Sequence, residues 1–255
     1  MVASLLSVLL SAPLTLFGAT STDTFHWSGH VTAGQRIEVR GINGSIHAQP
    51  AAGQSVEVIA FQSGRSIDPA SIGVKVVENE AGITIFAVPQ TPSSECSAEG
   101  PPSASGDPNV DFMVSVPAGV HFVARTVNGR VEAKSLDADT EAHTVNGDVV
   151  LSTTGAAQGE TVNGSITASV GKITSPLTFS TVNGAISLEV PRNAEARIHA
   201  NTQNGPIRSE FPLVIAGPFP TQRADGKIGR GGPELRIATV NGSIHLRRSK
   251  RFAKL

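Results

Sequence analysis

The sequence has a single cysteine, Cys96, no tyrosine, and aromatic residues at only 4% of its 255 positions. One cysteine cannot form an internal disulfide, so packing has to stabilise the fold in an oxidising compartment. So few aromatic side chains suit an aromatic-lined ligand pocket poorly. The 20 lysine and arginine residues nearly balance the 21 aspartate and glutamate residues, so no basic surface for nucleic acid is expected.

Long apolar runs are also missing, except at the start of the chain. Residues 1–19 carry no charged side chain, and the apolar run from Leu5 to Phe17 is short for a membrane span. The run suits the hydrophobic region of a secretory signal, so we predict a signal peptide over residues 1–20. A retained N-terminal anchor or a misassigned start is the alternative. We expect an exported mature protein without a transmembrane span, either periplasmic, secreted or on the cell surface.

The sequence is rich in one turn signal. Thr-Val-Asn-Gly occurs unchanged five times, and Gly-Ile-Asn-Gly and Thr-Gln-Asn-Gly extend the set to seven. Asn-Gly favours tight turns because both residues adopt positive φ at low cost. We therefore assign these residues a structural role rather than a ligand-binding one. The predicted turn residues are Asn43, Gly44, Asn128, Gly129, Asn146, Gly147, Asn163, Gly164, Asn183, Gly184, Asn204, Gly205, Asn241 and Gly242.

The residues around each turn alternate between apolar and polar, as they do in β-strands. A threonine usually stands two positions before the asparagine, and a β-branched aliphatic residue stands three positions after it. Positions five apart in a continuous strand point to opposite faces, whereas a tight turn between them returns both to one face. Each repeat is therefore strand, corner, strand, with one buried face. The aliphatic residues are Ile46, Val131, Val149, Ile166, Ile186, Ile207 and Ile244.

The repeats are almost evenly spaced. Successive asparagines from Asn128 to Asn204 lie 17 to 21 residues apart, which indicates stacked units that are each too small to bury a face alone. Two all-β architectures fit: a β-solenoid, resembling a β-helix, with one coil per repeat, or an antiparallel β meander that closes into a barrel or sandwich. We favour the β-solenoid, because the recurrence of all four residues suggests that like stacks on like, whereas a hairpin needs only Asn-Gly.

We expect residues 21–255 to form a single β repeat domain. Residues 22–89 contain irregular N-terminal strands, and residues 90–109 form a flexible loop rich in proline, serine and glycine. Residues 110–248 hold the regular repeats.

Both ends of the repeat array carry distinctive residues. His26 and Trp27 are candidates to cap one end of the stack, because a solenoid must cover its terminal faces. The basic segment after Leu246 is expected to be a solvated end, with contact to an anionic surface as the alternative.

Catalytic and metal-binding signatures are almost absent from the sequence. No His-Glu-x-x-His, Cys-x-x-Cys or Gly-x-Ser-x-Gly occurs, and the lone histidines suit solvent-facing strand positions, so no metal or cofactor is expected. A polysaccharide hydrolase needs two carboxyl groups that face one groove. The best candidates are Asp137, Asp139 and Glu141, which alternation places on one face. Their alternative interpretation is an exposed polar edge that deters pairing between molecules.

Three features together resemble the bacterial "putative adhesin" family, a domain of unknown function. They are the Thr-Val-Asn-Gly-x-Ile repeats, the lead-in Val114–Val120 and the closing segment Gly231–Leu246. The resemblance covers essentially the whole mature chain and implies an exported β-solenoid-like domain. Members of the family often carry a second cysteine near the position of Phe86, and its absence here leaves Cys96 without that partner; whether it pairs with another molecule stays open.

These observations favour a non-enzymatic, exported, adhesin-like module that interacts with a surface or with the cell envelope. Its candidate partners are envelope glycans or surface proteins, contacted by outward residues such as Arg130, Thr167 and Arg208. A polysaccharide-acting β-helix enzyme is one alternative. A passive structural or stress component of the envelope is the other.

Overall fold

The computed structural model describes residues 23–63, 72–89 and 109–249. The predicted signal peptide, Cys96 and nearly all of the predicted 90–109 loop lie outside these ranges. All regular secondary structure in the described residues is β, and no helix there could span a membrane. The first seven strands are β1 (Asp23–His30), β2 (Arg36–Arg40), β3 (Ile46–Pro50), β4 (Ser55–Ser63), β5 (Ile72–Asn79), β6 (Gly82–Pro89) and β7 (Asn109–Val116).

The regular repeats supply the remaining strands. They are β8 (His121–Arg125), β9 (Val131–Leu136), β10 (Thr140–His143), β11 (Val149–Thr153), β12 (Ala157–Glu160), β13 (Ile166–Ser169), β14 (Leu177–Asn183), β15 (Ile186–Val190), β16 (Ala196–Asn204), β17 (Ile207–Ser209), β18 (Val214–Ala216), β19 (Gln222–Ile228), β20 (Glu234–Asn241) and β21 (Ile244–Arg248).

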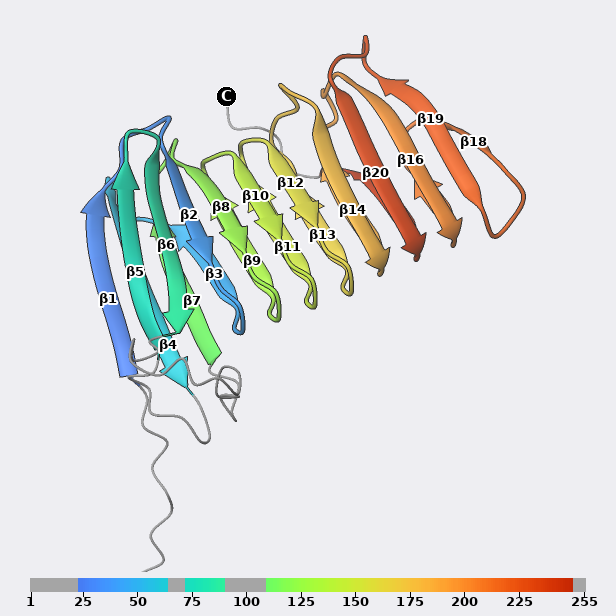
Figure 1. Cartoon of the computed structure of the whole chain (residues 1–255). Helices are drawn as coiled ribbons and strands as arrows, with labels where there is room; N and C mark the ends of the chain where they lie inside the picture. Colours follow the sequence, from blue (N-terminus) through green and yellow to red (C-terminus); the bar gives the residue numbers. More distant parts are fainter. Residues whose placement is uncertain (1–22, 64–71, 90–108, 250–255) are drawn as a thin grey trace, which may run out of the picture.

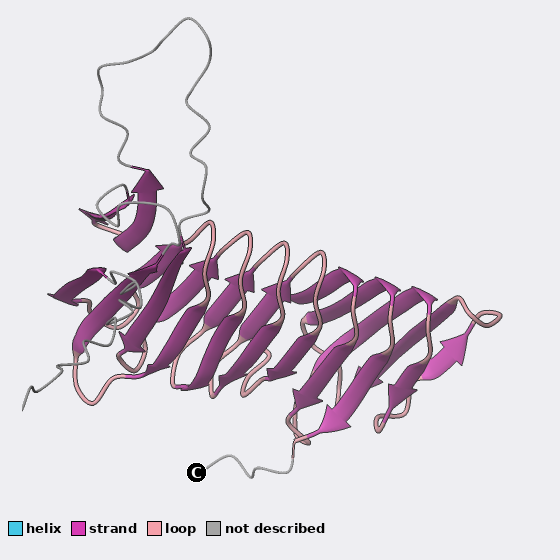
Figure 2. Cartoon of the chain, turned by 90° about the horizontal axis from the view of Figure 1, so that it is seen from below, coloured by secondary structure: helices cyan, strands magenta, loops and turns pink. Residues whose placement is uncertain are grey.

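The strands form two sheets, and each repeat contributes one strand to each sheet (Figure 1). The ten-stranded sheet has the order β1-β4-β7-β3-β9-β11-β13-β15-β21-β17, and the eleven-stranded sheet has the order β18-β19-β16-β20-β14-β12-β10-β8-β2-β6-β5. Successive coils pair in parallel, so that β10 lies between β8 and β12. Figure 2 shows the resulting stack along its length. The predicted all-β solenoid is confirmed, and the antiparallel meander is wrong for the repeats.

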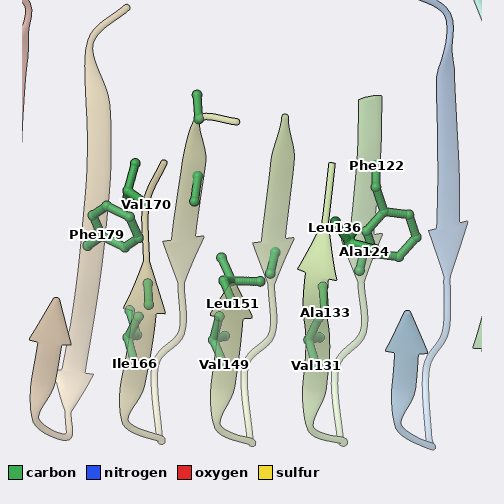
Figure 3. Packing of buried hydrophobic residues seen from close by; sticks show 14 of the residues in the cluster. Phe122, Ala124, Val131, Ala133, Leu136, Val149, Leu151, Ile166, Val170 and Phe179 are labelled. Carbon is green, nitrogen blue, oxygen red and sulfur yellow. The ribbon is translucent and has the colours of Figure 1, made fainter. Parts of the chain in front are cut away.

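The core is a set of apolar ladders between the two sheets. The β-branched residues predicted to face inward stack directly, since Val149 is the register partner of both Val131 and Ile166. Smaller inward residues such as Ala133 leave room for the fully buried rings of Phe122 and Phe179 (Figure 3). A single coil could not bury these side chains, so stacking supplies most of the hydrophobic stabilisation.

The order of the coils in space differs from their order in the sequence at both ends. Near the C-terminal end, the last coil, β20–β21, inserts between β14–β15 and β16–β17. Near the other end, β2–β3 lies between β6–β7 and β8–β9. Antiparallel strands close each end of the stack: β18 and β19 at one, β1, β4 and β5 at the other. Spacing along the sequence reports the number of coils but not their spatial order.

The strand β1 contains the two residues proposed as a cap. It is the edge strand of the ten-stranded sheet, where it pairs with β4. Trp27 packs partly buried against the core, and the exposed His26 contacts Glu57 at 2.7 Å.

Candidate functional site

All seven Asn-Gly pairs lie at one corner of the solenoid, where the chain passes from the eleven-stranded to the ten-stranded sheet. This corner runs along the lower edge of Figure 1. The side-chain amide of six of these asparagines donates to the side-chain carbonyl of the asparagine in the neighbouring coil, and Asn43 at the end only accepts. The ladder runs Asn204 to Asn241 (2.7 Å), Asn241 to Asn183 (2.8 Å), Asn183 to Asn163 (2.8 Å), Asn163 to Asn146 (2.9 Å), Asn146 to Asn128 (2.7 Å) and Asn128 to Asn43 (2.8 Å).

In six of the seven repeats, a threonine joins the same corner from the inside. Its hydroxyl is buried and donates to the carbonyl oxygen of the corner glycine in the adjacent coil, as from Thr161 to Gly147 at 3.0 Å. The same bond recurs from Thr126, Thr144, Thr181, Thr202 and Thr239. A buried hydroxyl without a partner is costly, so this bond explains why threonine recurs at an inward position.

The corner glycines are needed for a different reason from the one the sequence suggested. Of the seven, only Gly44 has a positive φ, at 124°, and none of the seven asparagines has one. A Cβ on Gly147 would instead lie 2.0 Å from the carbonyl oxygen of Gly129, and a Cβ on Gly164 would lie 2.0 Å from that of Gly147. Glycine is therefore required by the close approach of stacked backbones, and the expected left-handed turn geometry is wrong for most of the corners.

Beside the asparagine ladder runs a row of exposed aliphatic side chains, which we call the corner stripe. Its residues are Ile42, Val127, Val145, Val162, Val182 and Val240. The first five are 39% to 50% exposed, although valine and isoleucine are usually buried. Backbone bonds such as Val162 N to Val145 O, at 3.3 Å, hold neighbouring members in register. The stripe and the ladder together form a strip of apolar and amide groups that is held by hydrogen bonds between coils.

The opposite corner holds the predicted carboxylates Asp137 and Asp139. Both line an open cavity of about 410 Å³, together with Gly34, Gly119, His121, Ala138, Thr154, Gly155 and Lys172. Asp137 accepts a hydrogen bond from the Thr154 hydroxyl, and Asp139 accepts one from the backbone N–H of Ala156 at 2.8 Å. These contacts join adjacent coils, so both carboxylates have a structural use.

The third predicted carboxylate, Glu141, lies on the outer face of the eleven-stranded sheet. It contacts His121 at 3.3 Å and His143 at 3.9 Å. The neighbouring imidazoles of His121 and His143 outweigh the effect of burial and hold the pKa of Glu141 well below its usual range. A glycosidase needs a carboxyl group with a raised pKa as its general acid, and Glu141 has the opposite shift. The described residues also contain no group of three side chains suited to hold a metal ion.

An arginine cluster on the same outer face was not predicted from the sequence. The side chain of Glu38 is only 2% exposed and contacts Arg36 at 3.1 Å, Arg40 at 2.7 Å and Arg125 at 3.1 Å. Burial raises the pKa of Glu38, but the hydrogen bond from Arg40 and the charges of the three arginines outweigh it and lower the pKa. The alternation of Arg36, Glu38 and Arg40 was visible in the sequence, but the approach of Arg125, 87 residues away, was not.

Parallel coils, inter-coil ladders and antiparallel end strands define a β-solenoid domain. The chain belongs to the Toastrack family, DUF4097, whose family model matches residues 103–247. Two solved structures are similar to it. One is a "putative cell adhesion protein" from Clostridium sporogenes, with 9% identity over 89% of this chain and 100% of that chain, and a TM-score of 0.49. The other is a "putative adhesin" from Bacteroides fragilis, with 11% identity over 90% and 99%, and a TM-score of 0.35. No curated protein matches the sequence.

Proposed function

We propose that this protein is an exported, non-enzymatic module that binds a component of the cell envelope or a cell surface through its corner stripe. The observation that carries the proposal is the exposure of aliphatic side chains, coil after coil, beside a hydrogen-bonded amide ladder. Contiguous exposed apolar patches commonly mark interaction sites. Because the strip is held by bonds between coils, little conformational entropy is lost when a partner binds.

The carboxylates support the non-enzymatic part of the proposal. Asp137 and Asp139 are engaged in contacts between coils, and Glu141 is held in its charged form. The lowered pKa of Glu141 is the opposite of what a general acid at neutral pH requires. The family resemblance and the predicted signal peptide support export and an envelope or surface location.

The proposal is tested by incubating the labelled protein with intact cells, peptidoglycan, membrane lipid and extracellular polysaccharide, while released sugar is measured in the same tubes. We expect saturable binding to at least one fraction without release of fragments. Val145→Ser combined with Val162→Ser should weaken that binding, because it makes the centre of the stripe polar. Val214→Ser is the matched control, since Val214 is 74% exposed and lies outside the stripe.

Three results would count against the proposal. Absence of binding to every fraction would favour a passive structural role. Equal binding by the stripe variant and the wild type would exclude the stripe as the contact. Release of sugar that disappears in Asp137→Asn and Asp139→Asn variants with unchanged melting temperatures would favour the polysaccharide-acting enzyme.

A further inference from the structure

The outer face of the eleven-stranded sheet carries a row of basic residues around one aromatic side chain. Strand register places Lys75 of β5 beside Phe86 of β6, Phe86 beside Arg40 of β2, and Arg40 beside Arg125 of β8. Neighbouring strands are about 4.8 Å apart, so these four side chains share one small area of surface. The area lies near the N-terminal end of the stack, away from the centre of the corner stripe.

A buried carboxylate fixes the arginines of this row. Arg40 and Arg125 donate through Nε to the same oxygen of Glu38, Oε1, at 2.7 Å and 3.1 Å. Their hydrogen bonds to Glu38 use Nε alone, so the terminal Nη donors of two neighbouring guanidinium groups are not used by this carboxylate. With Arg36, three positive charges surround one negative charge, which leaves an excess of two. Such an excess beside low-dielectric walls attracts anions.

An apolar cavity adjoins the arginines. It has a volume of about 420 Å³ and is lined by Arg40, Gly41, Ile42, Val77, Thr84, Phe86 and Ala87. Ile42 is 50% exposed and Val77 is 46% exposed, so both offer aliphatic surface to a ligand. The charge and the apolar surface are therefore placed side by side, with Arg40 belonging to both.

We propose that this cavity binds a single anionic amphiphile, with its carboxylate or phosphate head on Arg40 and Arg125 and its aliphatic chain against Ile42, Val77 and Phe86. Guanidinium forks match the oxygens of carboxylate and phosphate groups and bind them more strongly than neutral donors do. A plain anion would leave the apolar lining exposed, and a neutral lipid would leave the excess charge unpaired. The arrangement fits a ligand that has both parts.

This inference stands apart from the proposed function, since Ile42 is the only residue that the cavity shares with the corner stripe. The substitutions that test it therefore avoid the stripe. If the cavity does not bind an anionic amphiphile, the corner stripe can still bind envelope fractions. If the stripe does not bind them, the cavity can still bind an amphiphile.

The test is calorimetric titration of the protein with decanoate and with decyl phosphate, each below its micelle concentration, and with the neutral decyl maltoside as comparison. We expect one saturable site for both anions and much weaker binding of the maltoside. Arg125→Gln should weaken anion binding by about tenfold or more, because it removes a charged donor. Val77→Ser should weaken it by removing aliphatic contact. Arg197→Gln and Val214→Ser, which alter exposed residues elsewhere, should bind as the wild type does.

Further variants and outcomes keep the test decisive. Arg125→Lys keeps the charge but loses the planar fork, and we expect it to bind between the wild type and Arg125→Gln. Should Arg125→Gln melt abnormally, Val77→Ser decides, because Val77 is half-exposed. Equal binding of the maltoside, or equal weakening by Arg197→Gln, would overturn the proposal. Binding to phosphatidylglycerol vesicles without binding of the free anions would also overturn it and indicate contact with a membrane surface instead.

Discussion

The hydroxyl of Thr144 donates a 2.9 Å hydrogen bond to the carbonyl oxygen of Gly129 in the neighbouring coil. A Cβ on Gly147 would lie 2.0 Å from that same oxygen. The threonine and the glycine of one repeat thus both contact one carbonyl oxygen of the preceding repeat. This shared oxygen explains why the two residues recur together, and it makes the corner sensitive to small changes.

Replacing a corner glycine by alanine should therefore be severe, even though φ is not left-handed. For Gly164→Ala, the new Cβ would press against the Gly147 carbonyl and force neighbouring coils apart. We expect a loss of about 2–4 kcal/mol in the free energy of unfolding, measured by urea denaturation. Gly53→Ala is the control, because a Cβ there meets nothing within 4 Å. Equal stability of Gly164→Ala and the wild type would contradict the close approach.

The buried hydroxyl of Thr144 should be worth a measurable hydrogen bond. Thr144→Val keeps the shape but removes the donor, and leaves the Gly129 carbonyl without it. We expect a loss of about 1–2 kcal/mol in the free energy of unfolding. Thr167→Val, at an exposed position of β13, should change stability by less than about 0.5 kcal/mol. Equal free energies of unfolding for Thr144→Val and Thr167→Val would show that the Thr144 hydroxyl does not stabilise the corner.

Position in the asparagine ladder should set the cost of removing a side-chain amide. Asn163 both donates to Asn146 and accepts from Asn183, whereas Asn204 at the end of the ladder makes only the bond to Asn241. We expect Asn163→Ala to cost about 1–2 kcal/mol and Asn204→Ala about half as much, because one bond is lost instead of two. Thermal unfolding of both variants tests this order. A larger loss at Asn204 would show that the ladder does not stabilise the stack as described.

The Glu141 carboxylate should make stability depend on pH in the acid range. Its pKa in the folded state is lowered by His121 and His143, so its contribution is complete above the unfolded-state value of about 4.3 and disappears as the pH falls below it. Glu141→Gln should therefore melt at a lower temperature than the wild type at pH 7, by an amount equivalent to about 1 kcal/mol. The difference in melting temperature between Glu141→Gln and the wild type should decrease steadily as the pH falls below 4.

The exposed Glu80 supplies the comparison for this pH dependence. Glu80→Gln should leave the melting temperature nearly unchanged at pH 7 and at pH 3. If the difference in melting temperature between Glu141→Gln and the wild type stays constant from pH 7 to pH 3, His121 and His143 do not stabilise the charged form of Glu141.

Much of the fold could be predicted because the same pattern of turn and strand residues recurs in every repeat. Alternation around Asn-Gly placed the threonine and the β-branched residue on one buried face, and identical tetrapeptides indicated like-on-like stacking. The reason for glycine could not be predicted, because the clash at Gly164 is with another coil and not with its own turn. The insertion of β20–β21 between two coils that precede it in the sequence could not be predicted either. A coil that pairs in parallel has the same alternating sequence pattern whichever coil lies next to it.

The candidate site was predictable only in part. Alternation correctly grouped Asp137 and Asp139, which line one cavity, but the histidine contacts that keep Glu141 charged come from β8 and β10 together. The corner stripe was present in the sequence as the valine of five repeats and Ile42 of the first. Its exposure follows from corner geometry, which turns this valine outward between a buried threonine and the asparagine ladder.

The most direct test of the proposed function is a binding isotherm of the full-length protein on the envelope fraction that retains it, compared with the Val145→Ser and Val162→Ser double variant. We expect the double variant to bind about tenfold or more weakly, with an unchanged melting temperature, and Val214→Ser to bind as the wild type does. Superimposable isotherms for the double variant and the wild type would contradict the proposed function.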